Sequence, residues 1–164
     1  MALTPHEHLE VRVRINRLAV VVVGALLFMS PFLTKETRAQ AQVPKALLLF
    51  GGHDHKTFLG CLNCVDTSDA SVCNDVGQYG SDVAANSIWN EVGPYGSDVS
   101  PTSPWNTVSD DGPIIVDRTG KSYGYFSANS VHHDRTRIDW LVAILDYYDK
   151  TNDLTKTREK MCSN

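Results

Sequence analysis

The chain has 164 residues, of which 42% are hydrophobic and 21% are charged, and its 15 Lys and Arg against 19 Asp and Glu give a net charge of −4. The charges are segregated, because the stretch between Lys56 and Arg118 holds nine acidic residues and no basic one. A protein that binds a phosphate backbone needs a basic face, so this distribution argues against nucleic acid as a partner.

The first 41 residues are predicted to be a secretory signal peptide. Residues 11–17 contain three arginines, residues 18–29 are all apolar or small, and residues 39–41 read Ala-Gln-Ala, a cleavage pattern. The apolar stretch is shorter than the roughly 20 residues of a membrane-spanning helix. We therefore expect one secreted or periplasmic domain over 42–164, with no membrane span after cleavage. Retention of the segment as an N-terminal membrane anchor is the alternative.

Two apolar stretches, 46–52 and 57–63, flank the sequence His-Asp-His-Lys and predict a β-hairpin. A motif then occurs three times at intervals of sixteen residues, in 71–83 (SVCNDVGQYGSDV), 87–99 (SIWNEVGPYGSDV) and 103–110 (SPWNTVSD). The first Ser of each copy is expected to cap a short helix or 3₁₀ turn. Gly77 and Gly93 are expected to end the first two turns with a positive φ, and Gly-Ser-Asp to form a tight turn.

The side chains of the repeats allow two interpretations. In the first, the tryptophans and the repeated valines pack inward, as these residue types usually do. In the second, the aromatic residues line an outer surface and stack on a ligand such as a sugar of the cell envelope. The residues of that candidate ligand site are Tyr79, Trp89, Tyr95 and Trp105.

The rest of the chain predicts a second hairpin and one helix. The hairpin comprises 113–118 and 122–129, and the helix covers about 135–150 with Asp134 as its cap. The apolar stripe of this helix consists of Ile138, Leu141, Val142, Leu145 and Tyr148. The order of elements predicts an α+β fold, in which a small antiparallel sheet of two hairpins carries a middle segment of turn repeats and the C-terminal amphipathic helix lies across the sheet.

Four segments in fixed order carry a family resemblance. They are FLGCLNC, the repeated S-[IP]-W-N with YGS, PIIVDRTGKSYGYFSAN, and RTRIDWL followed by LD. With these motifs the chain resembles a family of small secreted bacterial proteins that has no assigned function, over roughly Leu49 to Asp149. The resemblance implies a secreted single domain, and it implies no activity, ligand or catalytic residue.

The cysteines are expected to form disulfides, because an exported chain with an even number of cysteines is typically cross-linked. They are Cys61, Cys64, Cys73 and Cys162, which allow three pairings. A bridge from Cys73 to Cys61 or Cys64 would tie the first repeat to the preceding strand, and Cys162 would pair with the remaining thiol or stay free. The alternative is a zinc site, in which Cys61, Cys64 and Cys73 are joined by His53 or His55.

Two function classes follow from these observations. An enzyme would require the loops of His53/His55 and His132/His133 to meet, where they could hold a divalent metal that activates water or set up a His–Asp base. The chain has no HExxH, GxSxG or P-loop pattern. A binding module would use the acidic segment to attract a cationic partner or Ca²⁺. We favour the binding module, without catalysis or cofactor. The alternative is a metal-dependent hydrolase, with zinc or calcium as its metal.

Overall fold

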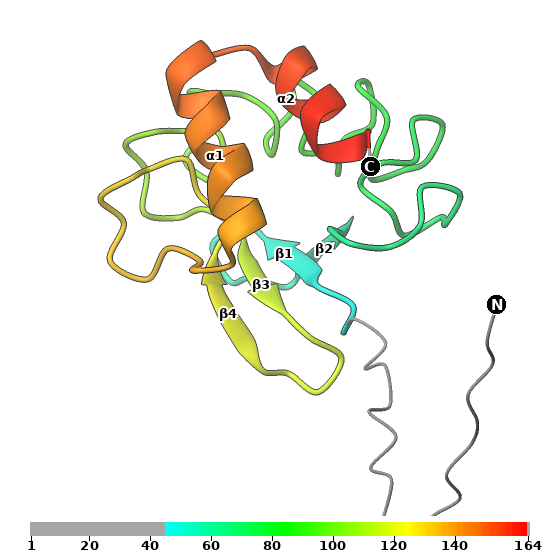
Figure 1. The fold of residues 1–164 in the computed structure, drawn as a ribbon, viewed down its shortest axis with the longest axis horizontal. Coiled ribbons are helices and arrows are strands. Elements are labelled where there is room, and N and C mark those ends of the chain that lie inside the picture. Colours follow the sequence, from blue (N-terminus) through cyan, green and yellow to red (C-terminus); the bar gives the residue numbers. More distant parts are fainter. Residues whose placement is uncertain (1–44, 164) are drawn as a thin grey trace, which may run out of the picture. The chain divides into compact units, whose positions relative to one another are not determined.

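The computed structural model describes residues 45–163, which form four short strands and two helices (Figure 1). The predicted signal peptide, 1–41, lies outside the described residues. The strands are β1 (Leu48–Gly51), β2 (Thr57–Cys61), β3 (Ile114–Val116) and β4 (Ser122–Tyr125). The helices are α1 (Asp139–Thr151) and α2 (Leu154–Cys162).

The strands form one antiparallel sheet in the order β2-β1-β3-β4. β1 pairs with β2 and β3 pairs with β4 to form the two hairpins. The hairpins are joined by the pairing of β1 with β3, which places Leu49 opposite Ile115. Leu49, Leu59 and Ile115 are fully buried and anchor the sheet in the core. The predicted α+β fold with a small sheet of two antiparallel hairpins is therefore confirmed.

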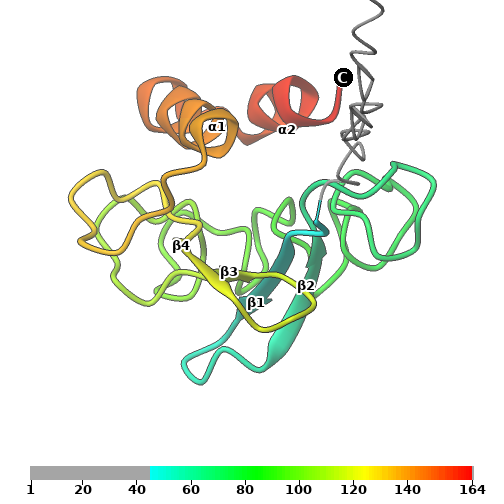
Figure 2. The same cartoon turned by 60° about the horizontal axis from the view of Figure 1, so that its bottom comes forward.

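The helices lie together on one side of the described residues, and the strands lie on the other, with loops of the repeat segment between and beside them (Figure 2). Tyr148 of α1 packs against Trp105 of the third repeat, with 4.9 Å between ring centroids. Within the described residues neither helix makes close backbone contact with a strand. α1 therefore packs on the third repeat through Tyr148, and its buried Leu141 and Leu145 belong to the same hydrophobic core as Leu49 of the sheet.

The helical region differs from the prediction in its boundaries. Asp134 does not cap α1, because its carbonyl oxygen accepts a bond from the Tyr125 amide (2.8 Å) at the end of β4, so the segment is extended there. α1 begins at Asp139 and ends where Asn152 takes a left-handed conformation with φ +48°. The side chain of Asp153 then caps α2, which the sequence analysis did not predict. Neither helix within residues 45–163 has the length and apolarity needed to span a bilayer.

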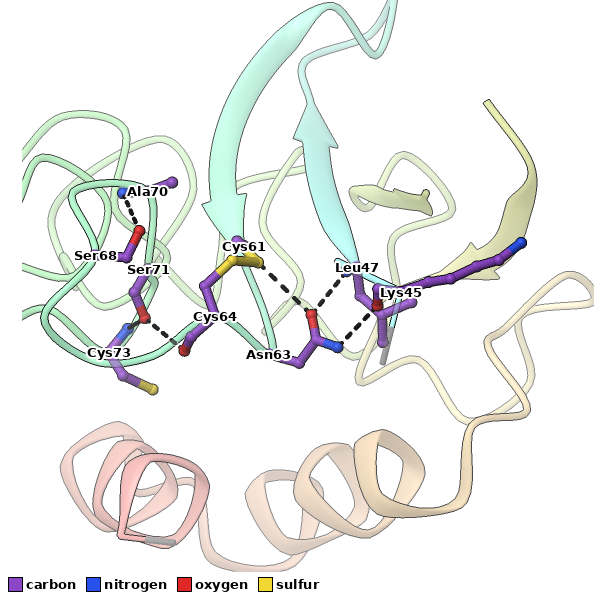
Figure 3. Close-up of a disulfide and its surroundings, with 9 residues drawn as sticks. All are labelled: Lys45, Leu47, Cys61, Asn63, Cys64, Ser68, Ala70, Ser71 and Cys73. Carbon is purple, nitrogen blue, oxygen red and sulfur yellow. Dashed lines mark hydrogen bonds between the residues drawn. A yellow bond between two sulfur atoms is a disulfide. The ribbon is translucent and has the colours of Figure 1, made fainter. Parts of the chain in front are cut away.

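The cysteines form two disulfides, Cys61–Cys64 and Cys73–Cys162. The prediction of disulfides is confirmed, but the expected bridge from Cys73 to Cys61 or Cys64 is wrong. Cys73 stands at the position that Trp89 and Trp105 hold in the other copies, and its side chain points toward the helices (Figure 3). Its partner is therefore the end of α2, and Cys61 and Cys64 pair with each other.

Candidate functional site: the groove between the repeats and α2

The serine at the start of each repeat copy forms a hydrogen bond with the backbone two residues later in the chain. The hydroxyl groups of Ser71, Ser87 and Ser103 accept hydrogen bonds from the amides two residues later, at 3.1, 3.1 and 3.2 Å. This bond was expected at the start of a short helix or 3₁₀ turn. The described residues 62–113 form turns and bends instead, so the serine stabilises a turn that does not continue into a helix.

The asparagine of each copy closes the same turn from inside. The side-chain oxygens of Asn74, Asn90 and Asn106 accept from the amide of the valine two residues later, at 3.3, 3.2 and 3.0 Å. Their amide nitrogens donate to carbonyl oxygens six residues earlier, each at 3.2 Å. The same side chain therefore satisfies a backbone donor and a backbone acceptor in every copy.

The glycines of the repeats are required by close approach of the backbone. A Cβ atom on Gly80 or Gly96 would lie 2.1 Å from the carbonyl oxygen of Asn74 or Asn90. Gly77 and Gly93 pack against the side chains of the same asparagines. The glycines with positive φ lie elsewhere in the described chain, so the prediction of a left-handed turn end at Gly77 and Gly93 is wrong.

The two repeat tryptophans are core residues that connect one copy to the next. The indole nitrogen of Trp89 donates to the carbonyl oxygen of Val72 (2.6 Å), and that of Trp105 donates to Ile88 (2.5 Å). Their rings stack with centroids 5.3 Å apart, and their exposed fractions are 3% and 0%. Buried rings of this kind cannot stack on a sugar, so the hypothesis of an exposed platform is wrong for Trp89 and Trp105.

The two tyrosines of the proposed platform are half-buried against the body of the domain. Tyr79 contacts Phe58 of β2 edge to face, with 4.9 Å between centroids. Tyr95 packs against the hydrophobic core. Neither ring presents an open face in the way that the platform hypothesis requires.

The repeated valines are exposed, contrary to the expectation that they pack inward. Their exposed fractions lie between 80% and 95% at Val76, Val83, Val92, Val99 and Val108. The inward positions of the copies are occupied instead by Val72, Ile88 and the tryptophans. The asparagine-closed turn places the residue two positions later at the outside of the loop, and this residue is a valine in all three copies.

Three adjoining clefts run between the repeat loops and α2, and we call them together the acidic groove. The largest, about 870 Å³, is bordered by Thr155, Arg158 and Glu159 of α2. A second of about 310 Å³ shares Thr155 and Arg158 with the first, and a third of similar volume shares Leu154 with the second. The acidic residues and valines that line the groove on the repeat side are Asp66, Asp69, Asp75, Val76, Asp82, Glu91, Val92 and Asp98.

The side chains that line the acidic groove carry a net negative charge. Among the described residues that line it, Arg158 is the one basic side chain. Burial, together with the nearby carboxylates of Asp98 and Glu91, raises the pKa of Tyr148 to about 12. The acidic segment is visible in the sequence, but the second wall of the groove is formed by α2, which the sequence pattern did not predict.

The two histidine loops approach each other on either side of Tyr125. The ring centroid of Tyr125 lies 5.4 Å from that of His55 and 4.3 Å from that of His132. His132 is buried, with Nε2 beside the carbonyl oxygen of Asp110 (3.2 Å) and Nδ1 accepting from the amide of Asp134 (3.1 Å). Both of its nitrogens are thus engaged in holding the loop.

The other two histidines of these loops are exposed and lie beside carboxylates. His53 lies 3.3 Å from a carboxylate oxygen of Asp111, and His133 lies 2.9 Å from one of Asp134. In the part of the chain that the structure describes, no group of three or more His, Cys, Asp or Glu side chains is arranged to hold a metal ion.

The thiolates of the zinc alternative are not available in this structure. Cys61, Cys64 and Cys73 are all consumed in disulfides, and a zinc site requires free thiolate sulfur. The remaining proposed ligands, His53 and His55, lie in the turn between β1 and β2. The set of ligands that the sequence analysis proposed is therefore not assembled.

Comparison with protein-family models, with curated proteins and with solved structures finds no match to this chain.

Proposed function

We propose that the chain is a secreted or envelope-associated binding module whose acidic groove holds an extended, basic peptide segment. The observation that carries this proposal is the pairing of exposed valines with carboxylates along the groove. Val76 follows Asp75 and Val92 follows Glu91, and all four residues line it. A peptide with alternating cationic and apolar side chains would match such a surface in charge and in apolar contact.

Comparison among the repeat copies supports a role of the valines outside the fold. The position of Val76, Val92 and Val108 is 84–95% exposed, yet it holds valine in each copy. The residue before it changes from Asp to Glu to Thr. The bond from the asparagine side chain uses the backbone amide of this position, which any residue except proline supplies. The turn therefore does not require a valine side chain.

The spacing of the carboxylates favours an extended ligand over a single cation. Calcium requires six to eight oxygen ligands converging on one point. The groove carboxylates do not form such a group within the described residues and are spread along the three clefts. Cationic side chains distributed along a peptide could each pair with a different carboxylate. Such contacts are exposed to solvent, so binding should weaken steeply with salt.

A titration with a defined peptide tests the proposal. The probe is a twelve-residue fluorescein-labelled peptide of alternating Lys and Val, and its control alternates Glu and Val. Fluorescence anisotropy with the secreted domain, residues 42–164, should show binding of the Lys peptide that falls at least tenfold between 50 and 300 mM salt. Equal binding of both peptides, or binding of neither, would contradict the proposal.

Two groove variants and one control variant locate the binding surface. The double substitution Asp82→Asn/Glu91→Gln should weaken binding of the Lys peptide, whereas Asp149→Asn, an exposed carboxylate on α1 outside the groove, should leave binding unchanged. Val92→Thr keeps the β-branched shape and should also weaken binding, because it replaces an apolar contact by a hydroxyl. An effect of Asp149→Asn as large as that of the groove variant would mean that the attraction is unspecific.

The alternative, a metal-dependent hydrolase, has less support. The two histidine loops do approach each other, but His132 already uses both ring nitrogens in hydrogen bonds to the backbone. A metal would have to replace one of these bonds before His132 could act as a ligand.

A further inference from the structure

Both disulfides of the domain border one cleft. This cleft, of about 270 Å³, is lined by Cys64, Cys73 and Cys162 together with Trp140 and Met161. Trp140 is an exposed aromatic side chain on the rim, and Met161 is buried. One sulfur of the Cys61–Cys64 pair and both sulfurs of the Cys73–Cys162 pair thus belong to residues that open onto the same space.

The two cysteines of the first disulfide differ in accessibility. Cys61 is fully buried at the end of β2, where its amide donates to Ala70 and its carbonyl oxygen accepts from Val72, at 2.6 and 3.1 Å. Cys64 is half-buried in the turn that follows. We therefore expect a thiolate that arrives from solvent to attack the sulfur of the more exposed Cys64, which makes Cys61 the leaving group.

The backbones of Cys64 and Cys73 are joined through a single hydroxyl group. Ser71 donates to the carbonyl oxygen of Cys64 (3.3 Å) and accepts from the amide of Cys73 (3.1 Å), so its Oγ atom bridges the two residues (Figure 3). Seen from this side, the sulfur of Cys73 points toward the helices. The Ser71 hydroxyl thus holds the backbones of Cys64 and Cys73 close to each other.

We propose that this cleft is a thiol–disulfide exchange site. After a reductant has reduced the Cys61–Cys64 bond, the freed Cys64 thiolate reduces the Cys73–Cys162 bond by exchange. A dithiol attacks the sulfur of Cys64, and Cys61 leaves as a thiolate and takes up a proton. The second thiol of the reductant then attacks the mixed disulfide, which releases the Cys64 thiolate and an oxidised dithiol. Cys64 attacks the sulfur of Cys73, and Cys162 leaves and is protonated.

The net reaction converts one dithiol into its disulfide and leaves the protein with one bond, Cys64–Cys73, and two thiols, on Cys61 and Cys162. The product releases α2 from the first repeat, because Cys73–Cys162 is the covalent link between them. The new bond would span nine residues in place of 89. This proposal does not rest on the proposed function, since its readout is the pairing of the cysteines.

Two single substitutions test the asymmetry between Cys61 and Cys64. Each folded variant is treated with iodoacetamide, and its alkylated and disulfide-linked peptides are mapped by mass spectrometry. In Cys61→Ser the Cys64 thiol is free, and we expect alkylation at Cys162 with a Cys64–Cys73 bond. In Cys64→Ser the remaining thiol is the buried Cys61, and we expect Cys73–Cys162 to persist with Cys162 unlabelled. Alkylation of Cys64 alone in Cys61→Ser would overturn the proposal.

A second measurement uses the unaltered domain and does not depend on the folding of a variant. The protein is exposed to less than one equivalent of dithiothreitol, quenched with iodoacetamide, and the species with one remaining disulfide is mapped. Exchange predicts labels on Cys61 and Cys162. Labels on Cys61 and Cys64, or on Cys73 and Cys162, would mean that each disulfide is reduced independently and that no transfer occurs.

Discussion

The sheet and the repeat segment satisfy the hydrogen-bonding groups of their backbones in different ways. In the sheet, backbone groups of neighbouring strands bond to each other, as between Leu49 and Ile115. In the repeats, which have no regular element, the hydroxyl of serine, the amide of asparagine and the indole nitrogen of tryptophan bond to the backbone. The backbone groups of a segment that consists of turns can therefore be hydrogen-bonded as fully as those of a sheet. In the repeats, these bonds depend on a few particular side chains, whereas the strands bond to one another through their backbones.

The largest effect is expected at Trp105, where the repeats meet the rest of the core. Trp105→Ala removes a fully buried ring that contacts Trp89, Phe126 and Tyr148, and it leaves the carbonyl oxygen of Ile88 without its donor. We expect a loss of about 3–5 kcal/mol in the free energy of unfolding, measured by urea denaturation. Val108→Ala, at an exposed position of the same copy, should change it by less than about 0.5 kcal/mol. Similar losses for both variants would contradict the assigned core.

The two disulfides should differ in their contribution to stability. The Cys73–Cys162 bond joins residues 89 apart and the Cys61–Cys64 bond residues three apart, for which the chain-entropy model gives roughly 4–5 and about 2 kcal/mol. We therefore expect Cys73→Ser/Cys162→Ser to lower the free energy of unfolding more than Cys61→Ser/Cys64→Ser. The reverse order would mean that the short bridge protects the junction of β2 with the first repeat.

A smaller loss is expected from Gly96→Ala, which tests the close backbone approach in the second copy. The added Cβ would lie 2.1 Å from the carbonyl oxygen of Asn90, so the turn must shift, at a cost of about 1–3 kcal/mol. Gly120 in the hairpin of β3 and β4 is the control. Its φ is +81° but it has open space around it, so Gly120→Ala carries only the conformational strain of about 1 kcal/mol. Thermal denaturation of both variants should rank them in this order.

The turn between β3 and β4 is held by the side chain of Asp117, as the turns of the repeats are held by their asparagines. The Thr119 hydroxyl, with the amides of Thr119 and Lys121, holds the pKa of Asp117 well below its usual range. Because the pKa is lower in the folded state, this stabilisation is complete above the unfolded pKa of about 4 and is lost as the pH falls further. Asp117→Asn should be less stable at pH 7 and should lose less stability than the parent between pH 4 and pH 2. An unchanged pH profile would contradict this role.

The sequence predicted the parts of the fold whose pattern is local. The two hairpins and most of α1 followed from apolar stretches and helical periodicity. α2 was missed because its nine residues are mostly polar or charged and only Leu154, Thr157 and Met161 are buried. The sequence Asn152-Asp153 could have signalled it, since asparagine suits a helix end and aspartate suits a cap.

The candidate site was predicted only in part, because its geometry is not local. The acidic segment was visible in the sequence, but the groove depends on a helix about 60 residues away in the chain. The outward position of the valines follows from the asparagine bond, which fixes the turn and cannot be read from hydrophobicity. The pairing of Cys73 with Cys162 likewise depends on where α2 lies.

The contacts of the helix pair set a limit on the number of repeat copies. The pair is joined to the first copy through Cys73–Cys162 and packs on the third through Tyr148 and Trp105. The length of the helical segment between Tyr148 and Cys162 therefore matches the distance from the first repeat copy to the third. A variant with a fourth copy inserted between these points could keep both attachments only if its helical segment were lengthened as well. Repeat arrays that are open at one end can grow by simple duplication, whereas this array can grow only together with its helices.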